Sequence, residues 1–368
     1  MRKKTIMVGL STILVFVLCS SSHAWPIPDT GQTKCYDNTE EIPCPQPGEP
    51  FYGQDGNYTI NPPSYTKLDA NGNDLPDDAT EWVMVRDNVT GLIWEMKNNM
   101  DGIQDYSNPH DADNTYTWYD SNPLTNGGYA GTPGDGTDTE DFINALNSAR
   151  VGGFSDWRPP TIKELRSIVD YGRLGPSINT TYFSNIVASS YWTSTTRAGG
   201  TSFAFLMDFL NGLGSYSYKS IRHYAPAVRG GKAGNQFINN GDGTITDSST
   251  GLMWQQVTAT GTYTWEQALS YCENLMLAGY TDWRLPTMKE LDSIVDLTSY
   301  NLGINTSYFP DTVASYCWSS TGYTLDTNKA WYMVFENDFD FYSDKSIYRY
   351  VRSMRGGQFR VLSCNFYA

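Results

Sequence analysis

One long segment occurs twice in the sequence, and this repeat constrains the fold more than any other feature. Residues 153–231 align without a gap with residues 279–357, at a constant offset of 126. About half of the aligned positions are identical, which is far more than chance similarity gives. The matches include Asp-Trp-Arg at 156–158 and 282–284, and Arg-Gly-Gly at 229–231 and 355–357. The chain is therefore predicted to hold two copies of one module in tandem.

The segments upstream of the repeat also match, but at other offsets. Residues 90–94 correspond to 250–254, and residues 115–118 correspond to 262–265. The first copy must then carry two insertions, before Thr115 and after Trp118, and both are rich in Asp, Asn and Gly. We divide the chain into four parts: a signal peptide (1–24), an N-terminal extension (25–81), a first module (82–231) and a second module (236–368).

Local patterns predict an α+β module with two helices and a small, mainly antiparallel sheet. The turn sequence at 240–243 predicts a hairpin at the start of the second module. Apolar residues at spacings of three and four predict a helix from Trp265, with a counterpart near Thr139. Thr-x-x-Glu capping boxes at 161–164 and 287–290 predict the start of a second helix in each copy. Short aromatic runs at 191–195, 202–209 and 227–229 are typical of strands.

The repeated motifs resemble those of a known family. Asp-Trp-Arg-x-Pro-Thr-x-x-Glu-Leu, a Tyr-Trp-x-Ser-Thr strand and a closing Arg-Gly-Gly are similar to the Lcl C-terminal domain family, which is grouped with C-type lectin-like folds. The same run also resembles the formylglycine-generating-enzyme variant of that fold. This resemblance implies two tandem C-type lectin-like modules. It also implies a disulfide between Cys272 and Cys364, which leaves Cys317 as an odd buried thiol.

The N-terminal residues predict export from the cytoplasm. Arg2, Lys3 and Lys4 precede an apolar stretch that ends in Ser-His-Ala at 22–24, the pattern of a signal peptide cleaved after Ala24. Lipidation at Cys19 is disfavoured because Leu18 stands where a small residue is expected. No later segment approaches the roughly 20 apolar residues of a membrane span. We expect a location in the periplasm, at the cell surface or outside the cell.

The net charge of the chain excludes some classes of partner, and the cysteines near its N-terminus predict a disulfide. The chain has 25 basic and 40 acidic side chains, and removal of residues 1–24 would leave 22 basic against 40 acidic. Such a surface repels nucleic acid and anionic lipid. Cys35 and Cys44 are close in sequence and outside the repeat, so in an oxidising compartment they are predicted to form a local disulfide.

Patterns typical of catalysis are weak. The first module has no cysteine for oxidase chemistry, and His110 and His223 are the only histidines after residue 24. No G-x-S-x-G motif occurs. The repeated Asp-Trp-Arg is interpreted as a capped helix entry with a core tryptophan and an Arg–carboxylate pair. We predict no catalytic residues, although paired carboxylates of a hydrolase are not detectable by sequence alone.

Acidic loops are the candidate binding residues. Hard oxygen ligands suit calcium, and the first insertion supplies a candidate calcium site at Asp101, Asp105, Asp111 and Asp113. A solvated acidic surface is the alternative. The loops that differ most between the copies predict a ligand-binding set in the second module: Tyr323, Asp326, Trp331, Glu336, Asn337 and Asp338.

These observations predict an exported, non-enzymatic binding protein. Its expected partner is a glycan or a cell-surface protein, held by the loops of the two modules with the avidity of a tandem arrangement. The alternative is a structural envelope or appendage protein that contacts other subunits, with homo-oligomerisation left open. The third hypothesis is an enzyme, either a hydrolase or one of the formylglycine-generating type.

Overall fold

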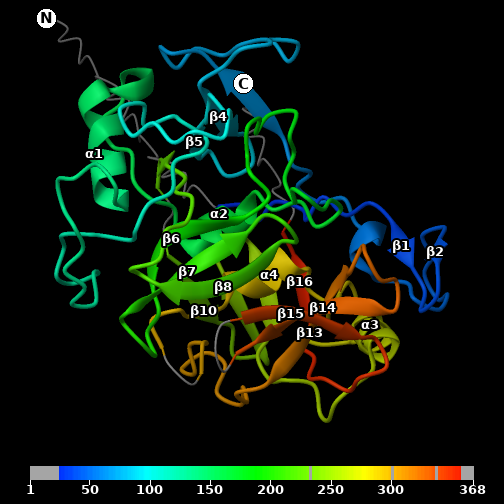
Figure 1. The fold of residues 1–368 in the computed structure, drawn as a ribbon. Helices are drawn as coiled ribbons and strands as arrows, with labels where there is room; N and C mark the ends of the chain where they lie inside the picture. The colour runs from blue at the N-terminus through cyan, green and yellow to red at the C-terminus, as the bar shows by residue number, and fades with distance from the viewer. Residues whose placement is uncertain (1–24, 232–233, 300–301, 336–338, 358–368) are drawn as a thin grey trace, which may run out of the picture.

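The computed structural model describes residues 25–231, 234–299, 302–335 and 339–357. The extension contributes β1 (Cys35–Tyr36) and β2 (Glu41–Ile42). The first copy contains β3 (Tyr65–Leu68), β4 (Met84–Asp87), β5 (Ile93–Glu95), α1 (Thr139–Ala149), α2 (Ile162–Ser167), β6 (Ser190–Thr196), β7 (Phe203–Asp208), β8 (Leu213–Tyr218) and β9 (Val228–Arg229). The second copy contains β10 (Phe237–Asn239), β11 (Thr244–Asp247), β12 (Leu252–Gln255), α3 (Trp265–Glu273), α4 (Met288–Ser293), β13 (Tyr316–Gly322), β14 (Lys329–Val334), β15 (Phe339–Asp344) and β16 (Met354–Gly356). Figure 1 shows these elements.

Each copy is built from two small antiparallel sheets. In the first copy these have the orders β3-β4-β5-β9 and β6-β7-β8, and in the second β10-β11-β12-β16 and β13-β14-β15. The short β1-β2 pair is a fifth sheet. The first and last strands of each copy share one sheet, which closes the unit on itself. Because β3 belongs to the first copy's sheet, that copy begins within the predicted extension.

The predicted fold class was wrong. The described chain is predominantly β, with five antiparallel sheets and four short helices of 11, 6, 9 and 6 residues. It does not form two helix-containing lectin modules. The helices contribute less than predicted, because α2 and α4 end at Ser167 and Ser293 and the next residues, Ile168 and Ile294, only cap them. Most of the regular structure lies in strands.

The local signals themselves were confirmed. Thr161 and Thr287 each form a complete capping box with Glu164 and Glu290. The hairpin at 240–243 joins β10 to β11. The α2 helix ends where the Ser167 hydroxyl donates to the Glu164 carbonyl at 2.6 Å, and Ser293 repeats this bond to Glu290 at the end of α4. Among the described residues no helix has the length and apolar character needed to cross a membrane.

The two copies pack against each other through α2 and α4, which Figure 1 shows near the centre of the molecule. Equivalent residues of the two helices form reciprocal hydrogen bonds, so the arrangement is nearly two-fold. Lys163 Nζ donates to the Ser293 carbonyl at 3.0 Å, and its repeat counterpart Lys289 donates to the Ser167 carbonyl at 2.8 Å. One large core cluster contains residues of both copies. Tyr171 meets Trp331 edge to face within it, with ring centroids 5.1 Å apart. The copies therefore share one large hydrophobic core cluster.

Sequence differences between the copies make this interface complementary. Buried Arg166 pairs with Asp292, which occupies the equivalent position of the repeat, and with Asp340 at 3.0 Å. Asp340 in turn accepts from the backbone amide of Gly214, its own counterpart, at 2.8 Å. With identical residues in both copies, two arginines would face each other in a buried site. The substitution of one arginine by aspartate replaces that repulsion by an ion pair.

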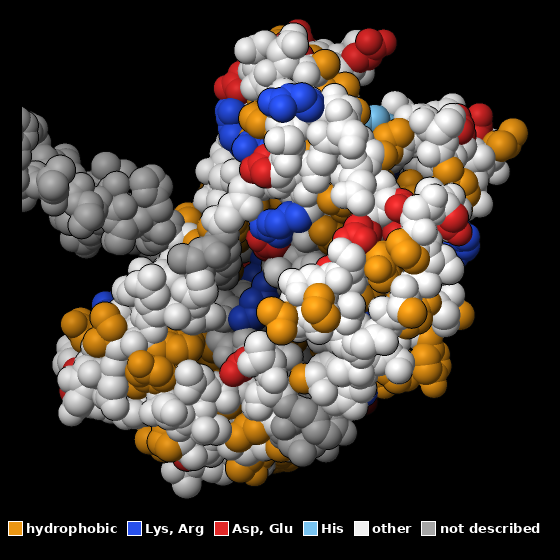
Figure 2. Space-filling model, turned by 90° about the vertical axis from the view of Figure 1, so that its left-hand side faces the viewer, with side chains coloured by type: hydrophobic (Ala, Val, Ile, Leu, Met, Phe, Trp, Pro, Cys, Tyr) orange, Lys and Arg blue, Asp and Glu red, His pale blue; other side chains and the backbone are white. Residues whose placement is uncertain are grey.

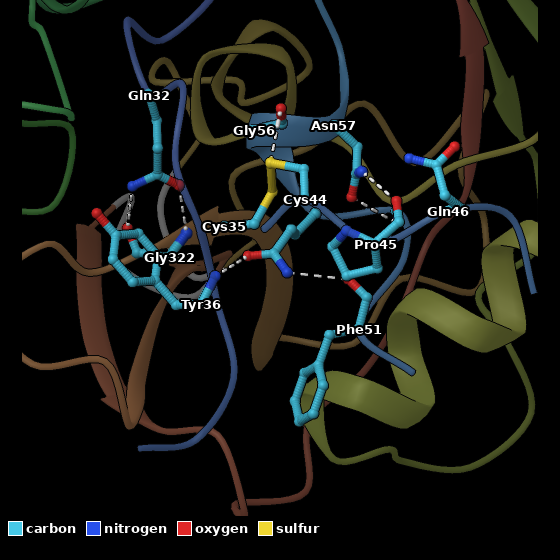
Figure 3. Close-up of a disulfide and its surroundings, with 12 residues drawn as sticks. Gln32, Cys35, Tyr36, Cys44, Pro45, Gln46, Phe51, Gly56, Asn57 and Gly322 are labelled. Atoms are coloured by element: carbon cyan, nitrogen blue, oxygen red, sulfur yellow. Dashed lines mark hydrogen bonds between the residues drawn. A yellow bond between two sulfur atoms is a disulfide. The ribbon is translucent and has the colours of Figure 1, made fainter. Parts of the chain in front are cut away.

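The N-terminal extension is tied to the second copy. The predicted Cys35–Cys44 disulfide is present, as Figure 3 shows. Gln32 pairs with the backbone of Gly322, donating to its carbonyl at 2.8 Å and accepting from its amide at 2.9 Å. The Lys345 ammonium donates to the carbonyls of Tyr36 and Asp37. The extension is therefore part of the folded unit. The predicted signal peptide lies outside the described residues.

Candidate binding cleft between the two copies

A cleft of about 880 Å³ opens beside the α2–α4 contact. Its walls come from both copies and from the segment that joins them: Arg158, Thr161, Lys163, Glu164, Thr195, Gly231, Gly234, Asn235, Gln236, Phe237, Ile294, Val295, Asp296, Leu297, Thr298, Asn305 and Tyr308. This volume lies within the 300–1,000 Å³ range of small-ligand sites. Figure 2 shows a hollow near the middle of one face, with basic side chains at its base.

The wall from the first copy is built on the start of α2. Arg158 donates to both carboxylate oxygens of Glu164, at 2.8 and 2.6 Å, and to the Gly230 carbonyl at 2.8 Å. The Arg158 side chain is 35% exposed, whereas that of Glu164 is 4% exposed. The bidentate pair holds the guanidinium in a fixed orientation. Arg158 can thus present a flat cationic surface to a ligand without losing its partner.

Thr195 adds a hydroxyl at the end of β6. Its oxygen accepts from the Ile162 amide at 3.2 Å, at the first turn of α2. In the part of the chain that the structure describes, the Thr195 hydroxyl proton has no acceptor. The site therefore offers a directed hydrogen-bond donor.

The opposite wall is the segment that follows α4. Asp296 accepts from the amide and the hydroxyl of Thr298, which shapes a tight turn. Within the described ranges the Leu297 amide donates to no acceptor. Tyr308 packs on Phe237 of the joining segment, with ring centroids 5.3 Å apart. The wall combines an aromatic surface, a carboxylate and an available backbone donor.

The predicted ligand-binding set lies elsewhere. Trp331 is 1% exposed and packs against the first copy, and Tyr323 stacks on Tyr342 at 3.8 Å. Asp326 forms an ion pair with Lys329. These three support the core and a strand turn. Glu336, Asn337 and Asp338 lie outside the described residues, so their role in binding stays a prediction.

The four predicted calcium ligands are used by their own loop. Asp113 accepts from the amides of Asp101 and Gly102, and Asp101 from that of Ile103. Asp105 accepts from the Ser107 amide and hydroxyl. Buried Asp111 accepts from Asn99 and from the Asp113 amide. No group of three or more His, Cys, Asp or Glu side chains suited to a metal occurs among the described residues. The structure therefore does not bring these ligands together, and calcium binding stays a prediction.

The two described thiols are in apolar surroundings. Cys272 and Cys317 are both free and buried. Burial raises the pKa of the Cys317 thiol to about 11 and raises that of Cys272 further. A thiol with a raised pKa is a poor nucleophile and a poor metal ligand at neutral pH. Cys364 lies outside the described residues, so the Cys272–Cys364 bridge stays a prediction.

The repeated Asp-Trp-Arg motif has the predicted structural role. Trp157 and Trp283 are buried. Asp156 pairs with Arg229, and Asp282 pairs with Arg355, which tie the motif to the closing strand of each copy. The motif connects the helix entry to the sheet.

The comparison with known families agrees with the repeat. The model of the Lcl C-terminal domain matches residues 83–229 and 243–355. The chain belongs to the Lcl C-terminal domain family. The two matched segments correspond to the two copies, and together they cover most of the chain. No curated protein matches this Lcl C-terminal domain protein significantly.

Sequence reasoning missed the cleft residues. Thr195, Leu297 and Tyr308 come from three separate parts of the Lcl C-terminal domain repeats. Thr195 and Tyr308 are identical in both copies, as Thr321 and Tyr182. That identity marks them as structurally important, but it cannot reveal that only one of the two equivalent positions is open.

Proposed function

We propose that this Lcl C-terminal domain protein is a non-enzymatic binding protein that acts outside the cytoplasm and holds an extracellular ligand in the cleft between its two copies. The observation that carries the proposal is the cleft itself, which is lined by the half-buried Arg158, by Thr195 and by Leu297. The signal-peptide pattern of residues 1–24 supports export.

A binding role fits this wall better than a catalytic one. Glu164 is held by Arg158 and by the Thr161 amide, so it is committed to the helix cap. The buried thiols lie away from the residues that line the cleft. A catalytic site needs a nucleophile or a base within reach of a positioned partner. The cleft offers hydrogen-bond donors, a cation and an aromatic ring, which are recognition groups.

The test is ligand capture with the cleft blocked. Protein beginning at Trp25 is applied to a glycan array and to a peptide array, alongside Thr298→Trp. Thr298 is an exposed residue of the cleft wall, so tryptophan there fills the space without entering the core. Met276→Trp is the matched control, because Met276 is 80% exposed and does not line the cleft.

The expected result is a ligand class that Thr298→Trp no longer captures and that Met276→Trp still captures. Ligands retained by both variants would show that the cleft is not the site. The expected glycan specificity would appear here as capture of one sugar class.

A structural role is the second candidate. Tyr316, Ile347 and Tyr348 of the second copy are 44%, 45% and 61% exposed. Contact with another protein would bury these side chains. Stoichiometric assembly that survives Thr298→Trp and is lost on Tyr348→Ser would favour this role over ligand capture.

A further inference from the structure

The cleft has an equivalent site on the other side of the two-fold arrangement, and that site is filled. The repeat offset maps Arg158, Thr161, Glu164 and Thr195 onto Arg284, Thr287, Glu290 and Thr321. It maps the wall at 294–298 onto residues 168–172. Around this second set lies the N-terminal extension of the same chain. The molecule thus contains one occupied and one open version of the same site.

The extension fills its site with peptide groups. The Thr321 hydroxyl donates to the Asp55 carboxylate at 2.5 Å, and Asn61 donates to the Gly357 carbonyl at 3.0 Å. The Tyr58 ring lies against the Arg284 guanidinium, 5.2 Å from its centroid. From an earlier part of the extension, the Thr30 carbonyl accepts from the Tyr171 amide at 2.8 Å. A carboxylate, an aromatic ring, an amide and a backbone carbonyl each meet a particular group of the site.

The open cleft presents the same receiving groups. Thr195 takes the place of Thr321, Arg158 that of Arg284, and Leu297 that of Tyr171. Gly231, the counterpart of Gly357, is exposed. The two sites differ in the exposure of their arginines: the Arg158 side chain is 35% exposed and that of Arg284 is 6% exposed. The cleft therefore exposes the groups that the extension covers in the filled site.

We propose that the cleft binds a short polypeptide segment of a partner protein, which places a carboxylate side chain on the Thr195 hydroxyl and an aromatic side chain on Arg158. This inference rests on the proposed binding function and names its ligand class. The extension is the template, because the spacing of Asp55, Tyr58 and Asn61 matches three receiving groups at once. A polypeptide is favoured over a glycan because the filled site is occupied by peptide groups.

The charges at the cleft allow an acidic ligand in spite of the negative surface of the whole protein. Arg158 and Lys163 stand on one wall with Glu164, and Asp296 stands on the other. These charges balance, so the cleft does not repel a single carboxylate as the rest of the surface does. A partner segment with many acidic residues would be repelled outside the cleft, which favours one carboxylate within an otherwise uncharged segment.

The probe is a peptide copied from the part of the extension that fills the equivalent site. The octapeptide with the sequence of residues 54–61, acetylated, amidated and labelled with a fluorophore, is titrated with protein beginning at Trp25. Its second residue corresponds to Asp55, and a second peptide carries Ala there. The expected result is saturable binding of the first peptide and on the order of tenfold weaker binding of the second, because the acceptor for the Thr195 hydroxyl is removed.

Variants at the two equivalent threonines show whether the peptide binds in the cleft. Thr195→Val removes the hydrogen-bond donor and is expected to weaken binding of the first peptide on the order of tenfold. Thr195→Ser keeps the hydroxyl and is expected to keep the affinity. Thr321→Val is the matched control: it alters the filled site, so it should lower the melting temperature without changing peptide affinity. The comparison of the two peptides on the unaltered protein does not depend on any variant folding.

The outcomes separate this inference from the proposed function. No saturable binding of the octapeptide up to 1 mM (about 4 kcal/mol of binding free energy), together with a sugar class that Thr298→Trp fails to capture, would overturn the peptide and keep the binding function. Equal affinity for both peptides, or equal affinity of Thr195→Val and Thr321→Val, would also overturn it. Failure of Thr298→Trp to affect any captured ligand would overturn both.

Discussion

Replacement of Asp55 by asparagine should stabilise the protein at neutral and alkaline pH. Asp55 is 2% exposed and accepts on one oxygen from the hydroxyls of Thr30 and Thr321, at 2.8 and 2.5 Å. Burial raises the pKa of this carboxyl from 3.8 to about 7, and the charges of Glu290 and Asp29 add to the rise, against the effect of the two hydroxyls. The native state thus carries a carboxylate in a place that disfavours its charge.

The magnitude follows from the pKa. A rise of about three pKa units corresponds to about 4 kcal/mol of native-state cost above pH 7. Between about pH 4 and pH 7 the native state holds a proton that the unfolded chain has lost, so stability falls as the pH rises through this window. Asparagine keeps an oxygen acceptor for both hydroxyls and never ionises. Asp55→Asn should therefore remove this contribution to the pH dependence.

Urea unfolding at pH 8.0 and pH 4.5 measures the effect. We expect Asp55→Asn to be more stable than the unaltered protein at pH 8.0, by up to about 4 kcal/mol, with a much smaller difference at pH 4.5. Asp37→Asn is the control in the same extension, because Asp37 is only partly buried and backbone amides lower its pKa. A loss of stability in Asp55→Asn that is equal at both pH values would refute the reasoning, since it would show a carboxylate that is stabilised in its charged form.

Three further predictions concern the frame around the cleft. Arg166→Met leaves Asp292 and Asp340 buried without their cation, so urea unfolding should show a loss of about 3–5 kcal/mol; a loss below about 1 kcal/mol would contradict a buried ion-pair cluster. Replacement of Cys35 and Cys44 by serine opens a short loop and should cost about 2–3 kcal/mol, whereas an unchanged unfolding midpoint would mean that the bridge does not constrain the extension. Arg229→Ala breaks a pair with an Asp156 that is 57% exposed, so differential scanning calorimetry should detect a change of at most about 1 kcal/mol; a larger loss would give this pair an unexpected role in the core.

The copies show which level of structure a sequence pattern can predict. The helix starts at Thr161 and Thr287 were predictable, because a capping box is formed by residues three positions apart. The helix ends were not, because they depend on whether Ile168 and Ile294 pack better in a helix or beyond it. That choice is made by the shared core, to which both copies contribute.

The predicted ligand-binding set shows another limit of sequence comparison. The loops that differ most between the copies were interpreted as variable recognition loops, and Tyr323 and Trp331 were assigned to them. In the structure these two aromatic side chains pack where the copies meet, so their difference from Arg197 and Phe205 reflects the asymmetry of that packing. Sequence difference between two repeats can mark an interface as readily as a ligand site.

The sequence by itself determined the duplication, the family, the helix caps and the local disulfide, because each is encoded by identity between segments or by residues within about ten positions of one another. The tertiary structure alone decided that the copies face each other across α2 and α4 and that the extension fills one of two equivalent sites. The Asp55–Thr321 bond joins residues 266 positions apart. No local pattern distinguishes Thr321 from Thr195, because the packing of the whole chain determines which of the two hydroxyls meets a carboxylate.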